Sequence, residues 1–413
     1  MKQLLHHTRL LPAAALLLVA AFQTSAANFT SGSTGLDGPL DVISNTVIQL
    51  PPDGVLNYTT ITVGQGNTLT FKRNALNTPV FLLATGDVVI DGSINVNGGH
   101  GSVTPFSGGL AGPGGFDGGS GGFTSADSVL PGGAGMGPGG GLPGPGGGYN
   151  WTGAGSGSYA TRAPQANALD GDAYGSNLLI PLVGGSGGGG VNGDPNRGGG
   201  GGGGAVLIAS STKITVNSTG SIVARSGEAS DSERYNSGSG GAVRLVAPRV
   251  YGKGTLDVRS NSSGVGDTAR VGGVGRIRVD SIFKVEPTNP GLENLSLTFI
   301  PGNSASVGST MIVFPPNTPS LSVVSAAGQA IAEGTPAPVQ VQLAFGSDTN
   351  QLVTVRARNF GADVPIRVAL IPAYGNPITY DTNIVNTATN PKDLNVMVGF
   401  PINTLVNVQV WTR

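Results

Sequence analysis

The chain of 413 residues contains no cysteine, few charged residues (11%) and three histidines. Without cysteine it can form neither a disulfide framework nor a thiolate metal site. A formal net charge of -1 excludes a globally basic nucleic-acid-binding protein. His6 and His7 stand near the start, which leaves His100, in the glycine-rich turn NGGHGSV, as the remaining imidazole. We therefore expect no catalytic residue, no metal site and no nucleic-acid partner.

The first 27 residues have the pattern of a secretory signal peptide. Lys2 and Arg9 precede the apolar run Leu10 to Phe22, and small residues follow at Ser25 to Ala27. No later run is apolar over the length of a membrane span. We expect residues 1–27 to be removed and the protein to be secreted, either extracellular or at the cell surface.

Internal repeats give the strongest indication of the fold. Stretches beginning at Phe81, Val206 and Val243 each contain three short strand-like runs, and a partial copy begins at Gly275. Strand alternation predicts that the inward pairs of the first runs are Phe81 and Leu83, Val206 and Ile208, and Val243 and Leu245. Matching strand triplets favour an all-β fold, a right-handed parallel β-helix, over an antiparallel sandwich. Residues 28–97 would form the N-terminal cap and first coils, and 205–314 the later coils.

Roughly 40 of the 71 glycines lie in an insertion at 98–204. Glycine recurs there every third residue, for example at Gly109, Gly112 and Gly115, which is the repeat of a polyproline-II-type helix. Breaks in the spacing leave two predictions open: an ordered bundle of polyglycine-II-like helices, or a disordered low-complexity loop.

Residues 315–413 contain less glycine and predict a separate immunoglobulin-like β-sandwich. The expected strands include SLSVVSA, APVQVQLAF, QLVTVRARNF, PIRVALIPA, DLNVMVGF and LVNVQVWTR. Trp411 is expected to be a core aromatic residue of this module.

Two groups of side chains are candidates for contact with a polyanion or glycan. In the predicted register Arg244 and Arg276 share one outward column, and Arg225 and Arg259 share another, so that stacked guanidinium groups face an acidic polymer. Tyr149 and Trp151 in the insertion are candidates for stacking on sugar rings. Charged side chains that only protect the sheets from pairing are the alternative interpretation.

Acidic residues are dense only in RSGEASDSERY, which contains Glu228, Asp231 and Glu233. These carboxylates are the candidates if the chain is an enzyme, since polysaccharide lyases and hydrolases need carboxylates clustered on one face. A solvated turn with compensating charges is the simpler interpretation. Asp170 and Asp172 in LDGDAYG resemble part of a calcium loop, but the carboxylate that would complete it is missing, so no cofactor is expected and a Ca2+ ion is the alternative.

The junctions GGGGGGGAVLIAS and SGSGGAVRLVAP, together with the repeats, resemble the adhesin-like glycine-rich parallel β-helix proteins that bacteria secrete to their surface or matrix. The resemblance covers about 28–281, in style of repeat. It implies a structural or adhesive protein that displays the glycine-rich loop toward a surface, matrix or polysaccharide. A carbohydrate-active β-helix enzyme and a self-associating extracellular filament subunit are the alternatives.

Overall fold

The computed structural model describes residues 29–102, 106–124, 129–144, 153–164, 168–191, 197–229, 236–261, 271–282, 298–299, 304–334 and 339–413. These residues form strands, turns and extended segments, so the fold is all-β, as predicted. In the same ranges no helix is long and apolar enough to cross a membrane. The predicted signal peptide lies outside them.

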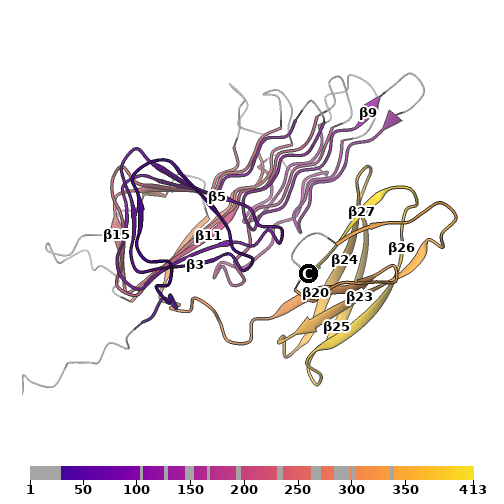
Figure 1. The fold of residues 1–413 in the computed structure, drawn as a ribbon. Helices are drawn as coiled ribbons and strands as arrows, with labels where there is room; N and C mark the ends of the chain where they lie inside the picture. The colour runs from indigo at the N-terminus through magenta and orange to yellow at the C-terminus, as the bar shows by residue number, and fades with distance from the viewer. Residues whose placement is uncertain are drawn as a thin grey trace, which may run out of the picture.

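Three parallel sheets make up the first part of the fold. The chain passes through them in rotation, and in Figure 1 they form the sides of a closed outline. Sheet 1 contains, in order, β1 (Leu40–Val42), β4 (Ile61–Val63), β7 (Val88–Ile90), β12 (Lys213–Val216) and β15 (Arg249–Gly252). Sheet 2 contains β2 (Thr46–Gln49), β5 (Thr68–Lys72), β8 (Ser93–Asn95), β13 (Ser221–Val223), β16 (Thr255–Asp257) and β18 (Thr298–Phe299). Sheet 3 contains β3 (Val55–Tyr58), β6 (Val80–Ala84), β11 (Ala205–Ser210), β14 (Ala242–Ala247), β17 (Arg276–Ser281) and β19 (Ser304–Gly308).

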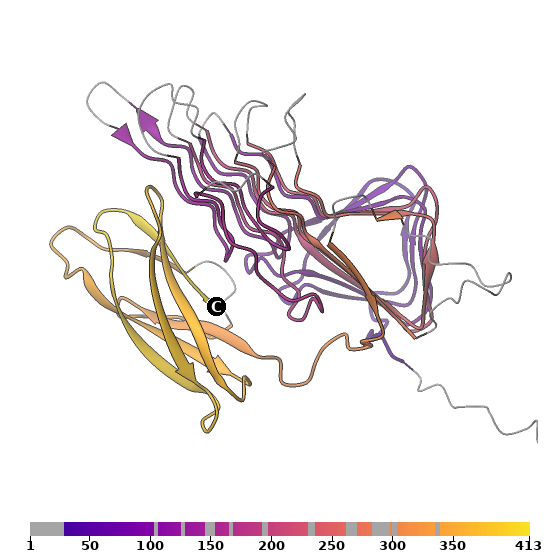
Figure 2. The ribbon, with the colours of Figure 1, turned by 180° about the vertical axis from the view of Figure 1, so that it is seen from behind.

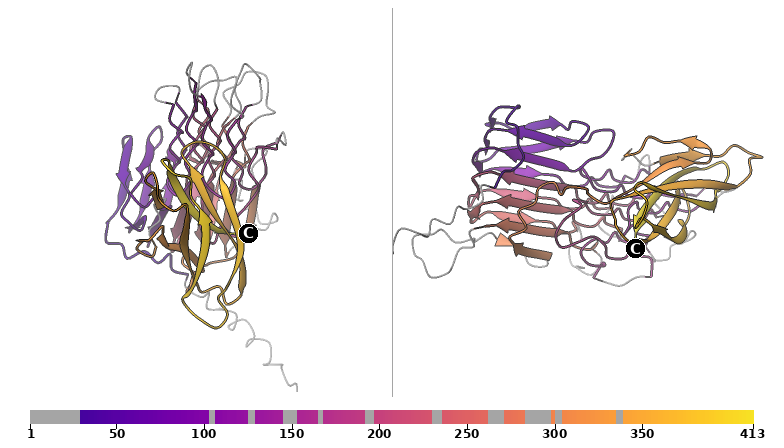
Figure 3. Two further views of the ribbon diagram at one scale, coloured as in Figure 1. Left: turned by 90° about the vertical axis from the view of Figure 1, so that its right-hand side faces the viewer. Right: turned by 90° about the horizontal axis from the view of Figure 1, so that it is seen from below.

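Aliphatic side chains fill the interior of this three-sheet body. Strands stack in register, so that equivalent residues form columns, as the view in Figure 3 indicates. In sheet 3 one inward column is Val80, Val206, Val243 and Ile277, and the next is Leu82, Ile208, Leu245 and Val279. All eight are at most 1% exposed, which makes this column core the main source of stability of the body.

The predicted inward pair Phe81 and Leu83 is wrong by one residue. Val80 and Leu82 pair with Val206 and Ile208 and enter the interior, whereas Leu83 faces outward. Leu83 is nevertheless fully buried, because Tyr159, Leu179 and Leu182 of the insertion pack on the outer face of sheet 3. When a strand is apolar on both faces, its sequence does not indicate which alternate residues point into the interior.

Extended segments continue from the corner between sheets 2 and 3 and lie side by side, as Figures 1 and 2 show. We call them together the glycine lattice. They are 96–102, 107–112, 115–122, 131–136, 139–144, 153–158, 168–172, 184–191, 197–204, 224–229, 236–241, 258–261 and 271–275. Several of these segments belong to chain beyond 98–204, an extension that the repeat pattern did not predict.

The central segment of the lattice is the unbroken glycine run Gly198–Gly204. Its amides donate in a three-residue rotation: Gly199 and Gly202 to 115–122, Gly200 and Gly203 to 236–241, and Gly201 and Gly204 to 96–102. Its carbonyls accept from three further segments, 107–112, 184–191 and 224–229. A three-fold rotation of backbone bonds is the geometry of extended helices with three residues per turn.

Close backbone approach on every side explains why this run is all glycine. A Cβ atom at Gly202 would lie 1.9 Å from the carbonyl oxygen of Gly185, and one at Gly200 would lie 2.2 Å from that of Gly227. At the edge of the lattice the constraint is weaker, and a Cβ atom at Gly144 would meet its nearest atom at 3.2 Å. In the outer segment 96–102, Asn97 and His100 stand three residues apart and are exposed. An outer segment can therefore carry side chains at every third position, whereas the unbroken glycine run belongs to an enclosed segment.

The last part of the fold consists of two antiparallel sheets around a common core. Sheet 4 contains β21 (Gln329–Ala330), β20 (Ser320–Ala326), β23 (Asn350–Arg358) and β26 (Lys392–Gly399). Sheet 5 contains β22 (Val339–Gln342), β27 (Leu405–Thr412), β24 (Asp363–Pro372) and β25 (Ile378–Val385). Sequence reasoning missed β25, an edge strand whose side chains are mostly exposed and whose apolar pattern is correspondingly weak.

Sheet 5 packs against the glycine lattice. The Gly375 amide donates to the Gly132 carbonyl at 2.9 Å, and the Gly137 amide donates to Oε1 of Gln409 at 3.1 Å. Trp411 packs at this contact beside Ala134, Ala369 and Ile371. The prediction that Trp411 belongs to the sandwich core is therefore wrong, since its ring is on the outer face of sheet 5.

Candidate functional site

One column of polar side chains follows the edge of sheet 2 where its strands end and the lattice begins. The strand register places Thr70, Asn95, Val223 and Asp257 side by side. Two residues further along each chain segment lie Lys72, Asn97, Arg225 and Arg259, and Gln49 pairs with Lys72 at the outer end. We call these five residues the polar column. Arg225 and Arg259 are neighbours in it, in agreement with the predicted register.

Asp257 holds the two arginines of the polar column. Its carboxylate accepts a 2.5 Å bond from Nε of Arg225 and 3.0 Å bonds from Nε and Nη2 of Arg259. Burial would by itself raise the pKa of Asp257, but the hydrogen bonds from Arg259 and Arg225 outweigh it, so the pKa lies below its usual value. The carboxylate is 2% exposed, whereas the side chains of Arg225 and Arg259 are 34% and 39% exposed. The cations thus face solvent and the anion does not.

The backbone also contributes to the rigidity of the column. The Arg225 amide donates to Oδ1 of Asn97 at 2.7 Å, and the Asn261 amide donates to Oγ of Ser226 at 2.9 Å. Short hydroxyl side chains form a parallel row on the same face, with a 3.0 Å bond from Ser221 to Ser93. The result is a flat face with hydroxyl groups beside a line of amides and cations.

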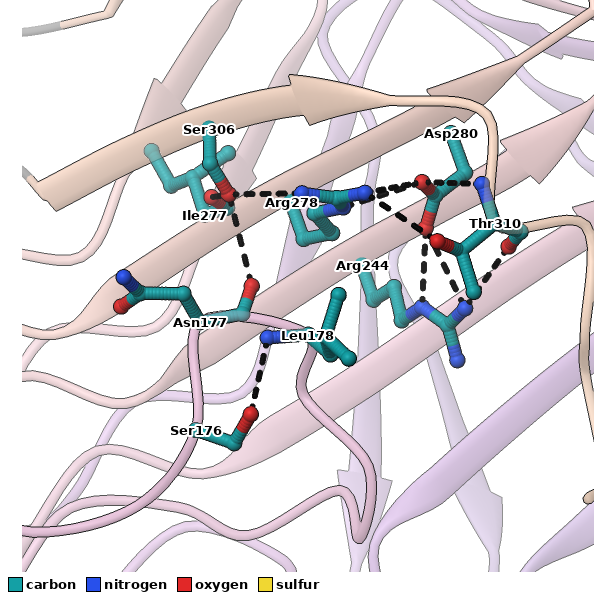
Figure 4. A network of polar contacts seen from close by, with 9 residues as sticks. All are labelled: Ser176, Asn177, Leu178, Arg244, Ile277, Arg278, Asp280, Ser306 and Thr310. Atoms are coloured by element: carbon teal, nitrogen blue, oxygen red, sulfur yellow. Dashed lines mark hydrogen bonds and ion pairs between the residues drawn. The ribbon is translucent and has the colours of Figure 1, made fainter.

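The predicted column of Arg244 and Arg276 is wrong, because Arg244 is paired in register with Arg278. Arg244 is 1% exposed and donates to Oδ2 of Asp280 and to the carbonyl of Thr310. Asp280 also accepts from Arg278, and Figure 4 shows the two guanidinium groups on either side of its carboxylate. Burial lowers the pKa of Arg244, while Asp280 opposes the shift. This cluster, in which Arg244 and Asp280 are buried and Arg278 is 11% exposed, fixes the segment after β19 to sheet 3.

Arg276 belongs to a different cluster. Its guanidinium carbon lies 5.3 Å from the centre of the Tyr159 ring, and Nη2 donates to the Tyr174 carbonyl at 2.7 Å. Nη1 also donates to Asn177. These contacts hold the 174–177 turn on β17, so Arg276 serves the packing of the insertion on sheet 3.

The candidate carboxylates do not form a described cluster. Glu228 is in the lattice, with its Oε2 atom 3.9 Å from Nδ1 of His100. Asp231, Glu233, Tyr149 and Trp151 lie outside the described residues. Over the part of the chain that the structure describes, no three His, Cys, Asp or Glu side chains come together as a metal ion would require.

Asp170 and Asp172 also have structural partners. Oδ1 of Asp170 accepts the Ser156 amide at 2.8 Å inside the lattice. Asp172 is exposed and lies 3.6 Å from Nε of Arg162. The two carboxylates therefore have different partners, Ser156 for Asp170 and Arg162 for Asp172, and these contacts do not bring them together as a calcium loop would.

The chain matches no protein-family model, no curated protein and no solved structure. The site must therefore be interpreted from its own geometry. Sequence reasoning found Arg225 and Arg259 but missed Asp257, Asn97 and Lys72. The available signal was strand alternation in LDVR, which places Asp257 and Arg259 on the same face.

Proposed function

We propose that the protein is a secreted or cell-surface structural protein with an adhesive role in a matrix or in glycan contact. On this proposal the three parallel sheets are a right-handed parallel β-helix, and the C-terminal sheets are an immunoglobulin-like module that supports the lattice. The rotation of the chain through three sheets favours the first assignment, and two four-stranded antiparallel sheets around one core favour the second.

The glycine lattice is the observation that carries this proposal. In its central segment, Gly198–Gly204, neighbouring backbone occupies the space that side chains would need. The surroundings of this segment therefore have room for neither a substrate nor a catalytic group. What such an interior provides is stiffness, because each segment is bonded to neighbours on several sides. A stiff plate whose central segment carries no side chains is suited to presenting surfaces and turns rather than to turnover.

Retention on the producing cells or their matrix tests the proposal. We expect the wild-type protein in the surface or matrix fraction, and we expect Gly202→Val, which disrupts the lattice, to be released to the medium. Gly144→Ala, at the lattice edge, is the matched control and should be retained.

A parallel assay measures turnover of acidic and neutral polysaccharides by the wild-type protein and by Glu228→Gln. The proposal is overturned if the wild-type protein is free in the medium and turns over a polysaccharide, and if Glu228→Gln abolishes that turnover. The enzymatic role would then replace the structural one.

A further inference from the structure

The polar column differs from the other arginine clusters in what it leaves open. Arg244 and Arg278 surround Asp280 in the same way as Arg225 and Arg259 surround Asp257, but their side chains are 1% and 11% exposed. At the polar column the Asp257 carboxylate is buried, whereas the side chains of Arg225 and Arg259 are 34% and 39% exposed. A ligand approaching from solvent therefore meets the cations first.

The five residues of the polar column also lie in a line across sheet 2, where an extended ligand could contact them in turn. Gln49, Lys72, Asn97, Arg225 and Arg259 follow one another on neighbouring strands, and none of the five is acidic. Neighbouring strands are about 4.8 Å apart, so a chain lying across sheet 2 meets a hydrogen-bond donor at each strand. Gln49, Lys72 and Asn97 are exposed.

The outward face of sheet 2 also has a row of hydroxyl groups, which the row of Thr70, Asn95, Val223 and the buried Asp257 separates from the column. Thr68, Ser93, Ser221 and Thr255 form the hydroxyl row, and each is partly exposed. Two lattice carboxylates border the column: Glu228, whose side chain is 14% exposed, lies beside His100, and Asp117, which is 24% exposed, pairs with Arg73, the residue after Lys72. Donors for carboxylates thus share the outward face of sheet 2 with groups that bond sugar hydroxyls.

We propose that the polar column binds a polysaccharide that carries carboxylate groups, with Arg225 and Arg259 as a preorganised pair and Lys72 as a further cation. The inference rests on the proposed role in matrix or glycan contact and names its ligand. Asp257 is a positioning residue here. Its carboxylate fixes two guanidinium groups but is itself buried, so it presents no negative charge to the ligand. Fixed guanidinium groups bind carboxylates with little loss of side-chain entropy.

Binding of the full mature chain to polygalacturonate, measured by calorimetry at physiological salt, tests the site. We expect Lys72→Glu, which leaves the Asp257 cluster intact, to weaken binding at least tenfold. Replacing Arg225 and Arg259 alone would leave Asp257 buried without a partner. The triple variant Arg225→Gln, Asp257→Asn, Arg259→Gln avoids that cost and should abolish measurable binding.

The matched control is Arg356→Gln with Arg358→Gln on sheet 4, together with Glu333→Gln, so that the net charge changes as much as it does in the column triple variant. This control removes the same number of arginines from another exposed face and should bind as wild type does. Dextran, which has no charge, should not bind. Dextran sulfate that binds with the same dependence on Lys72 would support the site and identify sulfate as an equal ligand.

The inference is overturned if wild-type protein does not bind polygalacturonate, or if the sheet 4 control weakens binding as much as the column variants do. The outcome is separable from that of the proposed function. Protein that is retained on cells but does not bind polygalacturonate contradicts the column as the site and leaves the structural role in place.

Discussion

The three-sheet body and the glycine lattice solve the same packing problem by opposite means. In the body, columns such as Leu82, Ile208 and Leu245 fill the space between sheets with methyl groups. In the central segment of the lattice, backbone meets backbone on every side, and a Cβ atom at Gly200 or Gly202 would be an obstruction. Stability in the body depends on what each side chain adds, whereas stability in the lattice depends on side chains being absent.

This difference predicts opposite responses to small changes in side-chain size. Removing methyl groups should damage the body, and adding one should damage the lattice. The lattice also gains no stability from apolar burial in its central segment, so its cohesion must come from the hydrogen-bonded network and close contact.

The largest effect is expected for Gly202→Ala. Its Cβ atom would lie 1.9 Å from the carbonyl oxygen of Gly185, and backbone cannot move aside as a side-chain end can. We expect a loss of more than about 3 kcal/mol in the free energy of unfolding, measured by denaturant titration.

Gly144→Ala provides the control for that change, since its nearest neighbour would be 3.2 Å away. It should cost less than about 1 kcal/mol, because the reduced freedom of the unfolded chain offsets a small adjustment. Equal effects at Gly202 and Gly144 would show that the lattice is looser than the hydrogen bonds indicate.

The second prediction concerns Asp280→Ala in the buried arginine cluster. Removal of the carboxylate leaves Arg244 charged and 1% exposed with its anionic partner gone. Breaking a buried pair from one side costs about 3–5 kcal/mol, and thermal unfolding should show this loss. Asp257→Ala should cost less, because Arg225 and Arg259 can turn to water. The reverse order would contradict the division into a buried and an exposed cluster.

The third prediction tests the aliphatic core. Leu82→Ala should destabilise the body by about 2–5 kcal/mol, since Leu82 is fully buried in an inward column. Val47→Ala, at a side chain that is 69% exposed, should change stability by less than about 0.5 kcal/mol. Amide exchange would also separate the two interiors: Leu82→Ala should accelerate exchange in β6 and β11 before it affects Gly199–Gly203.

Strand alternation predicts the inward residues correctly where one face of a strand is exposed to solvent and the other is buried. The inward residues of β8 and β12 follow from alternation because the other face of each strand carries polar side chains, Ser93 and Asn95 in β8 and Lys213 and Thr215 in β12. Alternation failed at β6, where Leu83 is covered by chain from the insertion. Coverage by a segment about a hundred residues away is a tertiary property that alternation does not encode.

The arginine columns show the same limit. Pairing Arg244 with Arg276 instead of Arg278 is a slip of two residues, and a two-residue slip preserves the apolar alternation of RIRV. Hydrophobic pattern therefore cannot choose between the two registers. The Arg225 and Arg259 column could be predicted because a glycine stands directly before each strand, Gly220 before β13 and Gly254 before β16, and aligns the two copies.

Acid should act on the two-sheet C-terminal part before the lattice, and this is the smallest effect. Hydrogen bonds from Arg358 and Arg356 lower the pKa of Glu333 from 4.5 to about 2. Because the folded-state pKa is lower, the ion pairs stabilise fully above the unfolded value of 4.5 and lose their contribution as the pH falls toward 2. Glu333 is exposed, so salt should reduce the effect further.

Backbone hydrogen bonds in the lattice do not titrate over this range. Between pH 4.5 and pH 2 we therefore expect amide protection, corrected for intrinsic exchange, to decrease in β23 and to persist in Gly199–Gly203. Glu333→Gln should reduce the pH dependence of protection in β23, where Asp393 continues to pair with Arg356, and should leave the lattice unchanged. A lattice that loses protection first would mean that its cohesion depends on nearby carboxylates such as Asp117, which pairs with Arg73 at its edge, and not on the backbone network alone.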